Sequence, residues 1–153
     1  MNYYKMLVFG DRHAVSNDKR IDRILLNIMA DCGPDLKYII DLGDGLDADC
    51  LSTYDKDHSQ LVGLQKELNS DYTFRSMINE VSPDSKKILL ECNHFSARLK
   101  KAMTREYWME DLDVLKQDNL LRLKELGWEL RTEWVWGSNR KILFMHGDGD
   151  LGI

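Results

Sequence analysis

Long hydrophobic runs are missing from this sequence, and no stretch approaches the roughly 20 apolar residues that a membrane-spanning helix needs. The N-terminus runs directly into a strand-like segment and carries no secretory signal pattern. Cysteine is scarce, and Cys32, Cys50 and Cys92 have neither paired nor metal-type spacing, which favours a reducing compartment. These absences predict a cytoplasmic protein with no membrane partner.

Excess positive charge is also missing. The formal net charge of -5 argues against a protein that coats nucleic acid without specificity. It does not exclude an enzyme acting on nucleic acid, because bound divalent cations would reverse the field locally. The chain has no internal repeat, low-complexity segment or linker, so we expect a single domain over residues 1–153.

What the sequence does contain is an alternation of short apolar runs and helical periodicity. Strands are predicted over residues 4–9, 37–42, 86–92, 128–136 and 141–145, and helices over 19–31, 58–81 and within 96–126. The first helix carries Ile21, Ile24, Leu25 and Ile28 on one face, and the second has a possible break near Asn69 and Ser70. This order predicts an α/β fold with a largely parallel sheet and an antiparallel addition late in the chain.

Polar groups follow the predicted strands in sequence order. They are Asp11 and His13 after the first strand, Asp44 and Asp47 after the second, Asn93 and His94 after the third, and His146 after the last. Each alone reads most simply as a polar loop, a turn or a helix cap. Together they gather carboxylate, imidazole and amide groups at one sheet edge and leave only His58 outside the set. Such ligands suit Mn, Fe or Zn.

This order of motifs resembles the calcineurin-like metallophosphoesterases over essentially the whole chain. Their pattern is Asp-x-His, Gly-Asp-x-x-Asp, Gly-Asn-His-Asp/Glu, a His after a strand, and Gly-His-x-His. The matching elements here are Asp11-Arg12-His13, Gly43-Asp44-Gly45-Leu46-Asp47, Asn93-His94 and His146-Gly147. The resemblance implies a metallophosphoesterase-like β-sandwich core flanked by helices and incomplete at its C-terminal end.

The resemblance also implies two divalent metal ions, with Mn preferred and Fe or Zn as alternatives. Asp11 and His13 would bind one ion, Asp44 would bridge both, and Asn93 and His146 would bind the second. Such a pair clamps a phosphoryl group and lowers the pKa of a shared water. The implied function is hydrolysis of a phosphate ester, either a phosphodiester such as nucleic acid or a small phosphoester, by a phosphatase or nuclease.

Two further residues have catalytic roles by the same resemblance. His94 would contact the phosphate or protonate the leaving oxygen, and Asp47 would orient it. An imidazole held by a carboxylate is a suitable general acid near neutral pH. Asn93 and Arg98 are expected to contact substrate, although a basic run like the one that contains Arg98 is more often a solvated helix face.

The sequence departs from the family pattern in the third motif and at the C-terminus. Cys92 stands where the family has Gly, which is acceptable if the backbone there does not need a positive φ. Phe95 stands where it has an acid, and this should weaken positioning of the site. The sequence ends at Ile153 without Gly-His-x-His, so each metal would lose one imidazole. We expect a fragment of a longer protein or a shortened member.

Two alternatives therefore stay open. One is a metal-dependent phosphoesterase, and the other is a catalytically incomplete relative that acts as a binding or structural protein. The predicted strand at 128–136 carries Trp128, Trp134 and Trp136 on one face. These rings could stack bases, but core packing is the simpler account. A further account is an apolar face left for self-association or for a missing C-terminal segment.

Overall fold

The main sheet has four parallel strands in the order β1-β2-β3-β4. Their bounds are β1 Lys5–Phe9, β2 Leu36–Asp41, β3 Lys86–Leu90 and β4 Trp128–Arg131. A computed structural model describes residues 4–16, 18–52, 61–105, 109, 111–136 and 141–146, and does not describe the Asn93 side chain. The predicted α/β class with a parallel sheet is confirmed.

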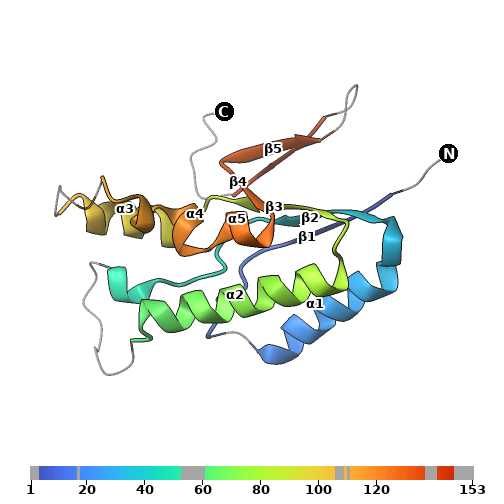
Figure 1. The fold of residues 1–153 in the computed structure, drawn as a ribbon, viewed down its shortest axis with the longest axis horizontal. Coiled ribbons are helices and arrows are strands. Elements are labelled where there is room, and N and C mark those ends of the chain that lie inside the picture. The colour runs from blue at the N-terminus through green and yellow to red at the C-terminus, as the bar shows by residue number, and fades with distance from the viewer. Residues whose placement is uncertain are drawn as a thin grey trace.

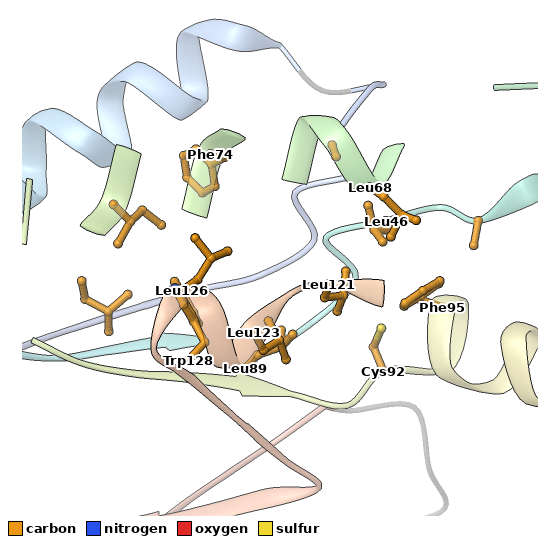
Figure 2. Close-up of a cluster of buried hydrophobic side chains, with 14 of the residues drawn as sticks. Leu46, Leu68, Phe74, Leu89, Cys92, Phe95, Leu121, Leu123, Leu126 and Trp128 are labelled. Atoms are coloured by element: carbon orange, nitrogen blue, oxygen red, sulfur yellow. The ribbon is translucent and has the colours of Figure 1, made fainter. Parts of the chain in front are cut away.

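Helices α1 (Lys19–Cys32) and α2 (Leu64–Val81) cover one face of this sheet (Figure 1). Gly33 ends α1 with a φ of 59° and donates its N–H to the carbonyls of Met29 and Ala30, as the Gly-Pro signal predicts. The shorter helices are α3 (Arg98–Met103), α4 (Gln117–Leu120) and α5 (Leu123–Leu126). The hydrophobic core cluster lies between the sheet and the helices, with contributions from α1, α2, α3 and α5 (Figure 2).

A small antiparallel sheet lies on the other side of the main sheet. It consists of β5 (Glu133–Trp136) and β6 (Ile142–Met145). Trp134 packs against both layers. Its ring centroid lies 5.3 Å from that of Tyr38 on β2 and 5.7 Å from that of Phe144 on β6. Ile40 and Ile88 alternate with the core-facing residues of β2 and β3 and are fully buried on this second face.

The structure corrects the prediction of one strand over residues 128–136. The chain bends at Thr132, so that β4 extends the main sheet while β5 pairs with β6. Trp128 is buried beneath the Arg75 guanidinium, 4.3 Å from its ring centroid, and Trp134 packs in the other layer. The expected shared face of three tryptophans is therefore wrong. The turn predicted at 137–139 lies outside the described residues.

Two helix predictions also change. On α1 the buried residue is Met29, with Leu25 and Leu26 packed against the core, whereas Ile21, Ile24 and Ile28 are exposed. Apolar residues lie on several sides of α1, so the sequence pattern alone did not show which side faces the sheet. Helix α2 runs unbroken through Asn69 and Ser70, and the Ser70 hydroxyl donates to the Ala14 carbonyl at 3.0 Å. Ser70 thus contacts the neighbouring loop instead of interrupting the helix.

Within the described part of the chain, none of the helices combines the length and the hydrophobicity that crossing a membrane requires.

Candidate functional site

Two loops at the carboxyl edge of the sheet carry most of the predicted site residues. We call residues 10–16 the β1 loop and residues 42–48 the β2 loop. Their backbones continue the pairing of β1 with β2, because the N–H groups of Asp11, His13 and Ala14 donate to the carbonyls of Gly43, Asp44 and Gly45 at 2.7–3.0 Å. These bonds hold the two loops side by side beyond the end of the sheet, where ligand sites of α/β folds occur.

Both loops contain residues in the left-handed backbone region. Asp11, His13, Asp44 and Ala48 have φ values between 48° and 52°. A non-glycine residue in this conformation costs on the order of 1 kcal/mol or more, and such residues concentrate at functional sites. Three of these four are residues that the sequence pattern assigned to metal. The strain is therefore located where the motifs predicted chemistry.

Asp44 and His146 approach each other although they lie 102 positions apart in the chain. His146 Nε2 lies 3.2 Å from Asp44 Oδ2, and His146 Nδ1 donates to the Leu42 carbonyl at 2.9 Å. Because a carbonyl only accepts, the Nδ1 proton is fixed, and Nε2 presents either a lone pair or a second proton to the carboxylate. Metal-ligating histidines show this arrangement, with one ring nitrogen donating to a backbone carbonyl and the other facing the ion.

The second oxygen of Asp44 strengthens this interpretation. Asp44 is 5% exposed, and its Oδ1 has no hydrogen-bond partner among the described residues. A buried carboxylate oxygen without a partner costs about 1–3 kcal/mol or more. A cation shared with His146 would remove that cost. The donor set therefore fits a divalent ion.

A second group brings together His13, Asp47 and His94, whose ligand atoms lie within 4.8 Å of one another. His13 Nδ1 is 2.6 Å from Asp47 Oδ1. Ligands around one ion would stand about 3.4 Å apart, given metal–ligand bonds near 2.1 Å in a tetrahedron. The observed distance is that of a charge-assisted hydrogen bond, so Asp47 orients the His13 ring and leaves its Nε2 free to bind a metal.

His94 lies beside this pair. Its ring centroid is 5.8 Å from that of His13, and its Nδ1 is buried without a hydrogen-bond partner among the described residues. The sequence pattern assigned Asp47 to orient His94, whereas the structure shows the Asp47 hydrogen bond going to His13. His94 is thus close to the predicted ligands and has a ring nitrogen available.

The third motif begins where β3 ends. Asn93 is the first residue of a π-helical turn, Asn93–Ala97, and its backbone follows Cys92 directly. Cys92 has φ −131° and ψ 161°, so the extended backbone accepts a side chain where the family has glycine. The residue that must be glycine for lack of space is Gly43, because a Cβ added there would lie 2.7 Å from the Cys92 Cβ. Burial raises the pKa of Cys92 to about 11, which keeps the thiol protonated beside Asp44.

Several of the predicted site residues line two surface clefts. Asp11 is exposed and, with His13 and Ser16, lines a cleft of about 400 Å³. His146 and Cys92 line a second cleft, of about 350 Å³, into which Lys100 also faces. His13 and His146, one residue from each group of candidate ligands, therefore line clefts that open to solvent.

Arg98 has a different environment from the one expected for a substrate contact. Its Nη1 donates to the Asp47 carbonyl and pairs with Asp49 Oδ1 at 2.7 Å. The side chain is 23% exposed. Arg98 therefore ties the π-helical turn and α3 to the end of the β2 loop, and part of its charge is neutralised there.

Sequence reasoning missed a buried polar network beneath the loops. Arg12, the middle residue of Asp-x-His, pairs with Asp71 at 2.8 Å, and Asp71 pairs with Arg75 at 2.7 Å. Arg75 also pairs at 2.8 Å with Asp41, whose other oxygen accepts from the Gly43 N–H. The spacing of Glu67, Asp71 and Arg75 at every fourth position of α2 places them on one face of that helix, but it does not indicate that this face is buried.

Comparisons with family models, with curated proteins and with solved structures found no match.

Proposed function

We propose that this protein is a metal-dependent phosphoesterase of the calcineurin-like type. The observation that carries the proposal is the Asp44–His146 pair, with its fixed imidazole tautomer and its unpartnered buried oxygen. The proposed fold is the metallophosphoesterase-like sandwich. Its support is the packing of the β5–β6 sheet against the face of the parallel sheet opposite α1 and α2.

In this proposal the ligands are Asp11, His13, Asp44, Asn93 and His146, and the cofactors are two divalent ions, preferably Mn. Bound cations would supply the positive charge that offsets phosphoryl charge and lowers the pKa of a water. Asp47 holds the His13 ring in place through the 2.6 Å hydrogen bond. His94, next to that ring, delivers a proton to the leaving oxygen of the ester.

The test combines metal binding with hydrolysis. Wild type, Asp44→Asn, His146→Ala and His94→Ala are compared in manganese titrations followed by thermal unfolding, and in hydrolysis of bis-p-nitrophenyl phosphate and p-nitrophenyl phosphate. Asp35→Asn is the matched control, since Asp35 is an exposed carboxylate next to β2 at the opposite end of that strand.

We expect Mn²⁺ at 100 times its Kd to stabilise wild type and Asp35→Asn by about 2.7 kcal/mol. Asp44→Asn and His146→Ala should lose that shift, while His94→Ala should keep it and lose turnover. Hydrolysis of the diester in preference to the monoester would favour a nuclease. If wild type shows neither a manganese-dependent shift nor hydrolysis of either ester, the enzyme proposal is wrong and the binding or structural alternative replaces it.

A further inference from the structure

We propose that α2 positions both ligand-bearing loops through a buried polar stripe formed by Glu67, Asp71 and Arg75. The three residues lie four positions apart and therefore share one face of the helix. Each is 1–2% exposed. Charged side chains are rarely buried this completely unless they are paired, so we ask which groups these three residues bind. The inference rests on the proposed function, because it makes these three residues the positioning residues of that site.

Glu67 and Asp71 contact the two loops directly, whereas Arg75 acts on the β2 loop through the last residue of β2. Glu67 Oε2 accepts the Ala48 N–H at 2.9 Å, directly after Asp47. Asp71 Oδ1 accepts from Arg12, which stands between Asp11 and His13 in the β1 loop. Arg75 pairs with Asp41, which accepts the Gly43 N–H and so fixes the turn before Asp44. The three contacts thus involve a residue next to each candidate ligand in these loops, namely Arg12 between Asp11 and His13, and Gly43 before Asp44.

Asp71 is the centre of the stripe, because it binds Arg12 and Arg75 with separate oxygens at 2.8 and 2.7 Å. One carboxylate thus links the β1 loop to the β2 loop through two guanidinium groups. Burial alone would raise the pKa of Asp71, but the charges of Arg75 and Arg12 outweigh it and lower that pKa. The carboxylate is therefore ionised when it holds both loops.

The contact between the stripe and the β2 loop is also close. A Cβ added at Gly45 would lie 3.3 Å from Asp71 Oδ1. The loop backbone consequently rests directly on the helix, and a shift of the stripe would displace the strained residues Asp44 and Ala48. Rigid holding of ligands by such outer contacts changes metal affinity typically 10–100-fold.

The experiment compares three stripe variants and one control. Asp71→Asn removes the charge while keeping the shape, Glu67→Leu removes the acceptor for Ala48, and Glu67→Gln keeps an acceptor. The control is Ser85→Ala, because the buried Ser85 hydroxyl donates to the Leu36 carbonyl at the opposite end of β2. Manganese affinity is measured by titration, and backbone amide hydrogen exchange of the metal-free protein is followed by mass spectrometry.

We expect the Kd for Mn²⁺ to rise at least tenfold in Asp71→Asn and Glu67→Leu, and to stay within about twofold of wild type in Glu67→Gln and Ser85→Ala. In the metal-free protein, exchange should accelerate selectively in residues 10–16 and 42–48 for Asp71→Asn and in 42–48 for Glu67→Leu. Exchange in β3 should not change in either variant.

The two readouts separate this inference from the proposed function. If wild type binds no manganese, the metal site fails, and the exchange pattern alone decides whether α2 holds the loops. Loop-selective acceleration then supports the inference, and uniform or absent acceleration overturns it. If wild type binds manganese but Asp71→Asn and Glu67→Leu bind it equally well, the positioning role is refuted. Glu67→Leu decides the question if Asp71→Asn does not fold.

Discussion

Replacing Phe95 with aspartate would introduce the acid that metallophosphoesterases carry after their Asn-His pair. The sequence alone suggests that this change should improve the site. The structure predicts the opposite, because Phe95 is 2% exposed and belongs to the main apolar cluster, at the end where Cys92 and Leu46 lie (Figure 2). The aromatic ring is a core residue, and a carboxylate at this position would enter the core.

The expected cost has two parts. Loss of a buried phenyl ring costs about 3–5 kcal/mol when the side chain is truncated. Burying an unpaired carboxylate adds several kcal/mol more. A domain of this size has about 5–15 kcal/mol of stability in total, so Phe95→Asp should be largely unfolded at pH 7. Phe95→Leu, which keeps the position apolar, should lose only about 1–2 kcal/mol.

Urea unfolding at several pH values measures both parts. Burial would raise the folded-state pKa of the introduced carboxyl above its unfolded value of about 3.9. The stability linked to that group is then present at acid pH and is lost as the pH rises. The deficit of Phe95→Asp relative to Phe95→Leu should therefore shrink from pH 7 towards pH 4. A Phe95→Asp protein as stable as Phe95→Leu, with tighter manganese binding, would refute this reasoning.

Two further predictions concern the polar stripe and the second layer. Burial raises the pKa of Glu67 above its ordinary value of 4.5, so the linked stability is complete below that pH and is lost as the pH rises through the folded-state pKa. In urea titrations wild type should therefore weaken relative to Glu67→Gln between pH 4 and pH 8, and the opposite slope would contradict the assignment. Trp134→Ala should lower the free energy of unfolding by about 1–3 kcal/mol, since its ring contacts both Tyr38 and Phe144. Thermal unfolding with near-ultraviolet circular dichroism measures this loss, and an unchanged midpoint would show that the two layers do not depend on Trp134.

The fold was predictable where local signals agree with tertiary packing. The apolar runs of β2 and β3 are buried on both faces, so they read as strands without knowledge of their neighbours. The Gly33-Pro34 pair ends α1 by a local backbone mechanism. The prediction of one strand over 128–136 was wrong because the alternation of apolar and polar residues continues across the bend at Thr132. Only the strand pairing shows that β4 and β5 belong to different sheets.

The candidate site shows a similar limit. Motif order placed Asp44 and His146 at strand ends, and the structure brings their side chains to 3.2 Å. No local pattern could choose between His13 and His94 as the partner of Asp47, since that choice depends on how two loops and the turn after β3 fit together. The hydrogen bond to His13 shows that Asp47 orients the His13 ring.

The polar stripe of α2 was hidden for a more general reason. Charged residues at every fourth position of a helix ordinarily mark the solvent side, and an isolated sequence gives no sign that Asp71 and Arg75 are buried. Their partners, Arg12 and Asp41, belong to segments 30 or more residues away in the chain. A buried ion network of this kind is weak evidence for stability, since well-packed apolar residues of similar volume often do as well. What apolar residues cannot do is hold the backbone of two loops with several residues at left-handed φ, and that requirement accounts for charges at the centre of this fold.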